Sequence, residues 1–267
     1  MYFGFEKISA AYGKRKILDE LTLEVKKGEF LALCGRNGCG KSTLLKTFSG
    51  AVKPCGGRVI LEEKPLFGHK RRDIAKKIAY LPQFCQIPGD IDVGTLVSYG
   101  RYPHRKIGHG LTAEDREIIR GTLELTELSD AAEREVRSLS GGERQRAWIA
   151  MTLCRQPDIL ILDEPAAHLD LGYQLETMEL LSRLVHEKNL TVLCVLHDLN
   201  LAARYCDRMA FLSGGRVFAV GSTGEMMTEE NIAEVFGISA RIASDDVDGR
   251  VYCIPQGRIG GTEGGRG

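Results

Sequence analysis

Residues 30–43 of this 267-residue chain read FLALCGRNGCGKST. The apolar run at 30–33 predicts a buried β-strand, and residues 43–48 continue the stretch with helical character. Between them, from Gly35 to Ser42, lies the pattern G-x-x-x-x-G-K-[ST]. Glycines let successive backbone N–H groups surround phosphate oxygens, and a helix N-terminus adds N–H donors and a positive dipole end. The stretch therefore predicts a nucleotide-phosphate site between a strand and a helix.

The charged and hydroxyl members of this loop have separate expected roles. Lys41 would contact the β- and γ-phosphates, and the Ser42 hydroxyl would bind Mg²⁺. At average amino-acid usage the pattern arises by chance in about one chain of this length per hundred, before a flanking strand and helix are required. The predicted phosphate-binding residues are Gly35, Asn37, Gly38, Cys39, Gly40, Lys41, Ser42 and Thr43.

Short runs rich in Val, Ile and Leu recur along the chain, and several are apolar at every position. Continuous apolar runs are typical of strands covered on both faces. Helical patterns lie between them; one, around Ile118, follows a candidate cap at Thr112, and another contains Trp148. This alternation predicts an α/β fold with a mostly parallel sheet. The predicted strands span residues 30–33, 58–61, 159–162, 191–196, 208–212 and 216–220.

The segment from about residue 84 to residue 157 separates two strand-bearing segments, and its second half reads almost wholly as helix. We therefore predict one α/β domain over residues 1–237, with a core of residues 1–83 and 158–237 and a helical insertion at 84–157. Residues 238–267 form a C-terminal appendage. Its last eleven residues, 257–267, contain six glycines and are expected to be disordered.

Composition excludes several classes of protein. The 36 Lys and Arg residues balance 36 Asp and Glu residues, so no net charge attracts nucleic acid or anionic lipid. The chain has no run of 18 or more apolar residues and no signal-peptide pattern, so we expect no direct membrane insertion. The eight cysteines form no Cys-x-x-Cys pair; reduced cysteines in a cytoplasmic chain are expected, rather than zinc ligands.

Two carboxylates, Asp163 and Glu164, follow the apolar run at 159–162. Ligands of open α/β folds bind at the carboxyl ends of the strands. Asp163 would hold Mg²⁺ or its water, and Glu164 would polarise an attacking water molecule. Strands often end in polar turn residues, so the pair alone leaves both interpretations open. The phosphate loop favours the catalytic interpretation.

Residues 139–145, LSGGERQ, precede the helix that contains Trp148. Ser140 is a candidate cap, and Gly141 and Gly142 would let the helix amides approach a phosphate. A plain cap is the alternative, but the string arises by chance in fewer than about one chain in 10⁴. A second phosphate site exceeds what one nucleotide needs. This excess indicates a symmetric homodimer that shares its nucleotides.

Together, the phosphate loop, LSGGERQ and ILILDEP at 159–165 resemble the nucleotide-binding subunit of ATP-binding cassette transporters, over residues 3–237. The resemblance implies a P-loop NTPase (RecA-like) core with an antiparallel N-terminal β part and an inserted helical subdomain. It further implies that the chain is an ATPase with ATP and Mg²⁺ as cofactors. Ala166 stands where the family usually has Thr.

The resemblance also assigns roles to residues outside the main motifs. Gln83 would contact Mg²⁺ and the attacking water, His197 the γ-phosphate, and Tyr12 the adenine, while Asp170, in His168-Leu-Asp170, would lie at the dimer seam. Structural alternatives remain for three of them. Gln83 alone is an ordinary loop residue, His197 a satisfied polar residue at a strand end, and Tyr12 a core aromatic.

Three stretches are similar to the ATPases of iron-siderophore, haem and vitamin B12 importers: YGRYPH at 99–104, residues 139–148, and LHDLNLAARY at 196–205. The similarity implies ATP-driven import with polytopic permease subunits and a substrate-binding protein. It places the chain in the cytoplasm, on the inner face of the cell membrane through the permease, without a nucleic-acid partner.

The alternatives are a cassette ATPase that acts on ribosomes or DNA, and a P-loop kinase. Ribosome-acting relatives usually carry two cassettes, and DNA-acting ones carry long coiled coils or zinc modules. A single cassette and zero net charge disfavour both. A kinase would leave LSGGERQ without a purpose.

Overall fold

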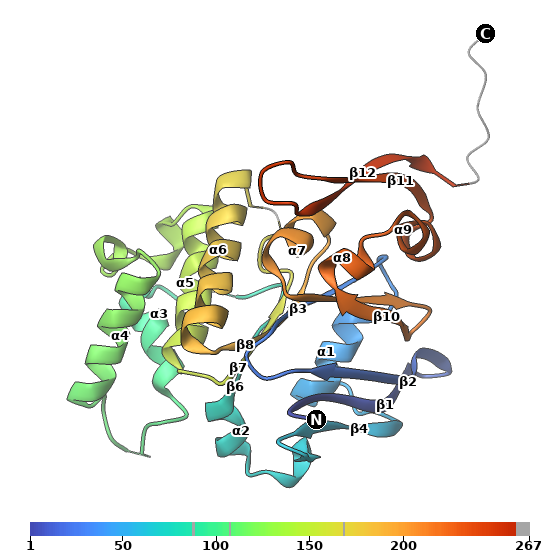
Figure 1. The fold of residues 1–267 in the computed structure, drawn as a ribbon. Coiled ribbons are helices and arrows are strands. Elements are labelled where there is room, and N and C mark those ends of the chain that lie inside the picture. Colours follow the sequence, from blue (N-terminus) through green and yellow to red (C-terminus); the bar gives the residue numbers. More distant parts are fainter. Residues whose placement is uncertain (87–88, 107, 168, 260–267) are drawn as a thin grey trace. The chain divides into compact units, whose positions relative to one another are not determined.

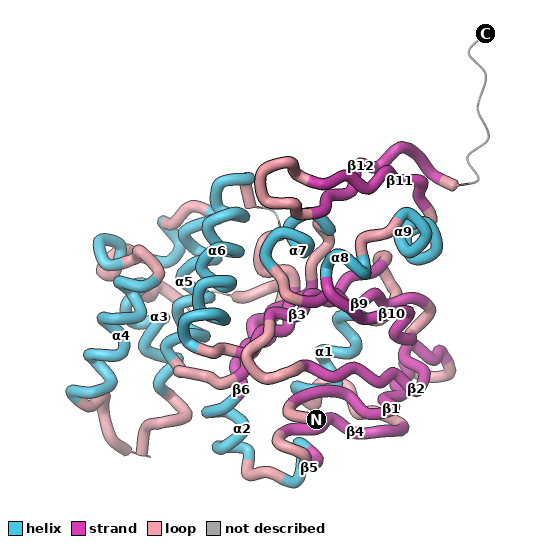
Figure 2. Tube along the Cα trace, in the orientation of Figure 1, coloured by secondary structure: helices cyan, strands magenta, loops and turns pink. Residues whose placement is uncertain are grey.

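The computed structural model describes residues 1–86, 89–106, 108–167 and 169–259, and Figure 1 shows their fold. The chain divides into two compact units. Unit 1 comprises Met1–Phe3, Val25–Glu29 and Ile60–Cys194, and unit 2 comprises Gly4–Glu24, Phe30–Val59 and Val195–Gly267. Strands alternate with helices along the chain, as Figure 2 shows, so the predicted α/β class is confirmed.

Unit 2 contains the phosphate loop and the C-terminal residues. Its strand β3 is buried at every residue and runs parallel to β9, with Gly35 opposite Leu212, while β9 and β10 are antiparallel. Strands β2, β1 and β4 are neighbours in a separate sheet. The elements are β1 (Phe3–Tyr12), β2 (Arg15–Val25), β3 (Phe30–Gly35), α1 (Lys41–Ser49), β4 (Gly56–Leu61), α7 (Leu199–Tyr205), β9 (Arg208–Ser213), β10 (Arg216–Ser222), α8 (Thr223–Met226), α9 (Glu229–Phe236), β11 (Ile238–Ser244) and β12 (Val251–Arg258).

Unit 1 contains the acidic pair and LSGGERQ. Strand β7 lies between β6 and β8, and β6 and β7 are parallel, with Ile78 opposite Ile159. The named elements between β6 and β7 are all helical, which agrees with the predicted insertion; its limits at residues 84 and 157 stay a prediction. The elements are β5 (Lys64–Pro65), α2 (Arg71–Lys77), β6 (Ile78–Leu81), α3 (Val93–Ser98), α4 (Ala113–Leu125), α5 (Gly141–Cys154), β7 (Ile159–Asp163), α6 (Leu171–Lys188) and β8 (Thr191–Val195), with short 3₁₀ turns at Leu66–Gly68, Tyr99–Arg101, Ser129–Ala131 and Val136–Ser138.

The expected disorder from residue 257 onward is wrong for its first two residues. Gly257 and Arg258 end β12, where they pair with Ser239 and Ile238 of the antiparallel strand β11. Pairing with β11 offsets the conformational entropy that Gly257 loses when it is ordered in a strand. Residues 260–267 lie outside the described residues. Within the described part of the chain, no helix combines the length and the apolar character that a bilayer crossing requires.

A buried ion pair explains part of the YGRYPH stretch. Arg101 is 4% exposed, and its Nε donates to Asp115 Oδ1 at 2.8 Å. Its Nη1 donates to the carbonyl of Cys154 at 3.0 Å and to Gln156 Oε1 at 3.1 Å. Burial raises the pKa of Asp115, but the hydrogen bonds from Arg101 and Thr112 and the charge of Arg101 outweigh it and lower the pKa to about 2.

We expect Arg101→Met to lower the free energy of unfolding by about 3–5 kcal/mol at pH 7, because it leaves the Asp115 carboxylate buried without its partner. A lowered carboxyl pKa gives stability that is present above the unfolded pKa, 3.8, and is lost as the pH falls towards 2. The difference between variant and wild type should therefore be smaller at pH 3 than at pH 7, measured by urea denaturation.

The matched control is Arg120→Met, since Arg120 pairs with Glu117 on the exposed surface of α4. Exposed ion pairs contribute about 0–1 kcal/mol. If Arg101→Met cost no more than Arg120→Met, the buried pair would not stabilise unit 1.

Candidate functional site

The phosphate loop in unit 2 is shaped by glycines at its two ends. Gly35 has φ 152°, and a Cβ there would lie 2.4 Å from the carbonyl oxygen of Leu212. Gly40 has φ 114°, and its Cβ would lie 2.7 Å from Leu18 Cδ2. Both positions combine a left-handed backbone with a close neighbour, so neither admits a side chain without rearrangement.

Lys41 holds its ammonium group over this loop. The residue is 5% exposed, and its Nζ donates to the carbonyls of Gly35 at 2.7 Å and Arg36 at 3.1 Å. Gly40 is the N-cap of α1 and supplies no side-chain cap. The first N–H groups of a helix have no intrahelical partner and readily bind anions. The predicted phosphate-binding residues thus form the loop between β3 and α1 and the first turn of α1, and their contact with phosphate stays a prediction.

Two more predicted residues lie in unit 2. His197 is exposed and directly precedes Asp198, the N-cap of α7. Tyr12, the last residue of β1, is 50% exposed. Its interpretation as a core aromatic is therefore wrong, and its contact with adenine stays a prediction.

The acidic pair lies at the carboxyl end of β7 in unit 1, as predicted. Asp163 is 4% exposed, while Glu164 is half-buried and has a left-handed backbone with φ 56°. A non-glycine residue in this region costs on the order of 1 kcal/mol and is often found at functional sites. Gln83 Nε2 donates to Glu164 Oε2 at 2.7 Å. The fold thus brings together two of the predicted catalytic residues, 81 positions apart.

The charge of Asp163 also acts on a neighbouring strand. Burial, and to a lesser degree this charge, raise the pKa of Tyr80 in β6 to about 12. The phenol therefore stays neutral beside the carboxylate at physiological pH.

The predicted cap of α5 is confirmed. Ser140 Oγ accepts from the Glu143 N–H at 3.2 Å, and Glu143 Oε2 accepts from the Ser140 N–H at 2.8 Å. The bond from the Ser140 backbone, followed by that from the Arg134 side chain, lowers the pKa of Glu143. Gly141 has open space where a side chain would stand. The turn is thus a stable cap that presents an accessible glycine.

Gly142 lies under an aromatic ring that sequence reasoning missed. A Cβ at Gly142 would lie 2.3–2.5 Å from ring atoms of Tyr173 in α6. Arg146 lies 5.5 Å from the centroid of the same ring and forms ion pairs with Glu127, at 3.2 Å, and with Glu176. The glycine pair signalled a close approach, but local sequence could not show which distant residue makes it.

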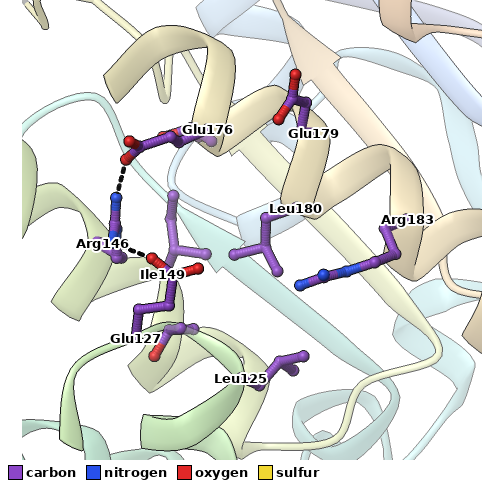
Figure 3. Close-up of a pocket in the computed structure, with 10 residues that line it drawn as sticks. Leu125, Glu127, Arg146, Ile149, Glu176, Glu179, Leu180 and Arg183 are labelled. Carbon is purple, nitrogen blue, oxygen red and sulfur yellow. Dashed lines mark hydrogen bonds and ion pairs between the residues drawn. The ribbon is translucent and has the colours of Figure 1, made fainter. Parts of the chain in front are cut away.

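Figure 3 shows this arginine at the edge of a cavity of about 350 Å³, with Ile149 and Leu180 as apolar lining. Arg146 points towards the two carboxylates that bind it. The arrangement ties α5 and α6 together and contains none of the predicted site residues.

The predicted dimer-seam residue Asp170 caps α6, with Oδ1 accepting from the Tyr173 N–H at 3.0 Å. His168 lies outside the described residues. Gln174 Nε2 donates to the carbonyls of Ala166 at 3.3 Å and Leu169 at 3.1 Å. A side chain that sequence analysis did not select therefore holds the turn where Ala166 replaces the usual Thr.

Comparisons with known proteins agree with these motifs. The ABC transporter family model matches residues 18–167. The chain is 42% identical over 253 residues to the Probable siderophore transport system ATP-binding protein YusV of Bacillus subtilis (strain 168), covering 95% of this chain and 92% of that protein.

Two solved structures are similar to most of this chain. One is the inward-facing structure of a metal-chelate type ABC transporter, with 27% identity and a TM-score of 0.83, covering 96% of this chain and 97% of the other. The second is a dimeric ATP-binding cassette in a post-hydrolysis state bound to ADP and Pi, with 28% identity and a TM-score of 0.71, covering 83% and 98%.

Gly142→Ala is expected to lower the free energy of unfolding by about 1–3 kcal/mol, because the new methyl group overlaps the ring of Tyr173. The matched variant Gly141→Ala, which meets no atom within 4 Å, should cause no loss. In a Tyr173→Ala background the Gly142→Ala penalty should vanish, as urea denaturation of the four variants can measure. Equal effects at the two glycines would contradict the contact.

Proposed function

The chain belongs to the ABC transporter family, and on that premise we propose that it is the ATP-hydrolysing subunit of an importer for an iron complex, such as a siderophore or haem, or for vitamin B12. The observation that carries the catalytic part is the bond from Gln83 to Glu164 beside the buried Asp163. The similarity to a siderophore-transport ATP-binding protein and to a metal-chelate type transporter supports the class of cargo.

The ATP phosphates are assigned to the loop of residues 35–43, where Lys41 takes the β- and γ-phosphates and the backbone N–H groups the remaining oxygens. When ATP binds, the Nζ of Lys41 exchanges its loop carbonyls for phosphate oxygens. Tyr12 stacks against the adenine. His197 contacts the γ-phosphate, and Glu164 polarises the attacking water, which Gln83 helps to place.

Mg²⁺ fits the donor set at its proposed position. The hydroxyl of Ser42, the carboxylate of Asp163 and the amide oxygen of Gln83 are hard oxygen ligands of the kind that Mg²⁺ prefers. The nitrogen of the Gln83 amide donates to Glu164, which leaves Oε1 of the same amide as the metal-binding atom. Bound Mg²⁺ would neutralise charge on the phosphate oxygens.

Two copies of the chain complete each nucleotide site in this proposal. One copy covers the γ-phosphate that the other copy holds, and it does so with Ser140, Gly141 and Gly142. Asp170 lies at the interface between the two copies. The open space at Gly141 supports this assignment, as does the similarity to a dimeric cassette bound to ADP and Pi. Because ATP contacts both copies only in the closed dimer, its binding favours closure, and loss of the γ-phosphate favours opening.

A polytopic permease is the proposed membrane partner, supplied with cargo by a substrate-binding protein, and it holds this chain at the inner face of the cell membrane. Unit 1 has a groove of about 500 Å³ lined by Arg71, Arg72, Arg105 and Lys106, among others. At this groove Tyr102 is 79% exposed. None of the described residues that line the groove is acidic. An acidic cytoplasmic segment of the permease would complement this surface.

Glu164→Gln should bind ATP, accumulate closed dimers and hydrolyse ATP at least about 100-fold more slowly, because the amide cannot polarise the attacking water. Size-exclusion chromatography in MgATP and a phosphate-release assay measure the two effects. Glu187→Gln, an exposed carboxylate change in α6, is the control and should leave both unchanged. Wild-type turnover by Glu164→Gln would remove Glu164 from its role.

The double variant Arg71→Glu/Lys106→Glu should retain basal ATPase activity within about twofold but lose stimulation by the permease in proteoliposomes, because reversed charges repel an acidic segment. The exposed pair Arg116→Glu/Lys188→Glu carries the same charge change outside the groove and should keep the stimulation. Full stimulation of the groove variant would place the docking surface elsewhere.

A further inference from the structure

One side chain fastens the C-terminal β11–β12 hairpin to helix α7. Asn200 Nδ2 donates to the carbonyl oxygen of Cys253 at 3.2 Å, and the Cys253 N–H donates to Asn200 Oδ1 at 2.7 Å. The carboxamide of Asn200 thus binds both polar groups of one backbone residue, as a neighbouring strand would. Asn200 belongs to the LHDLNLAARY stretch, which the proposed hydrolysis mechanism uses only at His197.

The hairpin packs with one face on the helices of unit 2. Strand β12 contacts α7 and β11 contacts α9, and Figure 1 shows the hairpin running past these helices. Cys253 and Ala240 are buried, whereas Tyr252 and Ile254 are about 40% exposed, as expected when side chains alternate along a strand. The two hydrogen bonds of Asn200 (the clasp) therefore hold the backbone of a residue whose side chain lies on the packed face of the hairpin.

The clasp is formed in the first turn of α7, directly after His197. Asp198 Oδ1 accepts from the N–H groups of Asn200 at 2.8 Å and Leu201 at 3.1 Å. The backbone of Asn200 is bound to the cap next to His197, while its side chain is bound to the hairpin. A short chain of contacts thus leads from Cys253 to the residue beside His197.

We propose that the β11–β12 hairpin positions His197, and that Asn200 is the positioning residue through which it acts. The inference rests on the proposed contact of His197 with the γ-phosphate. Small displacements of a group that must meet a reacting phosphate reduce the rate steeply. By restraining the first turn of α7, the clasp limits the orientations of the imidazole without itself touching the nucleotide.

Steady-state ATPase kinetics of the full-length chain test the proposal. Asn200→Ala should lower kcat about three- to tenfold and leave KM for ATP within about twofold, because phosphate binding by the loop is unaffected. The matched control is Asn231→Ala. Asn231 Nδ2 donates to the carbonyls of Glu225 at 3.4 Å and Met226 at 3.1 Å, so the control removes similar side-chain-to-backbone bonds in the same unit.

The control variant should lower the melting temperature to a similar extent but keep kcat within about twofold of wild type. If Asn200→Ala left kcat within twofold, or if Asn231→Ala lowered kcat equally, the clasp would serve stability alone and the proposal would be overturned.

A double-mutant cycle with His197→Ala separates this inference from the proposed function. Asn200→Ala should cause no further loss in the His197→Ala background, measured by single-turnover phosphate release over hours, which resolves slow residual rates. Additive losses would show that Asn200 acts independently of His197 and would overturn the proposal. Wild-type turnover by His197→Ala would instead remove His197 from the proposed hydrolysis mechanism, together with any need to position it.

Discussion

The buried ammonium group of Lys41 constrains the backbone of the phosphate loop. A buried charge without partners is strongly unfavourable, so oxygen atoms must surround it. The carbonyls of Gly35 and Arg36 turn inward to provide them, at 2.7 and 3.1 Å from Nζ. At the ends of the same loop, Gly35 and Gly40 have left-handed backbones, and close neighbours leave no room for a side chain. The contacts of the ammonium group and the two glycines together define the shape of the loop that is proposed to bind phosphate.

In unit 1, contacts within the fold likewise hold the side chains that are proposed to act in hydrolysis. The left-handed backbone of Glu164 directs a carboxylate to the amide of Gln83, and this bond orients both groups before any nucleotide arrives. At LSGGERQ, Ser140 satisfies the start of α5 while Gly141 stays open. The candidate functional residues Ser140 and Asp163 thus lie at a helix cap and at a strand end.

Sequence analysis predicted the elements that local patterns define. The apolar runs identified β3, β7, β8 and β9 because buried strands are apolar at most positions, and they also identified β4 and β10, which are only partly buried. Thr112 and Ser140 were recognised as caps because a capping box spans only four residues. Strands β11 and β12 were missed: they bury few side chains, and only their pairing makes them strands.

The residues of the candidate site could be predicted where a motif sets their spacing along the chain, but not where they depend on contacts between distant segments. Motifs predicted the loop and the acidic pair, because glycine, lysine and carboxylate positions are set by spacing along the chain. The ring over Gly142 and the support for the turn at Ala166 come from Tyr173 and Gln174, whose contacts depend on how α6 packs. No pattern within the motifs themselves identifies these two side chains.

The buried position of Arg101 has a consequence for exchanging recognition segments between related importers. Residues 99–104 look like a portable surface loop, yet Arg101 binds Asp115 and Gln156 inside unit 1, and a methyl group on Gly100 would meet the Met151 carbonyl at 2.2 Å. If these six residues were grafted into a related protein, the guanidinium of Arg101 would be buried without acceptors unless the residues corresponding to Asp115 and Gln156 were transferred as well. Tyr99 and Tyr102 have exposed rings, so substitutions at these two positions disturb the packing of the stretch less than substitutions at Gly100 or Arg101.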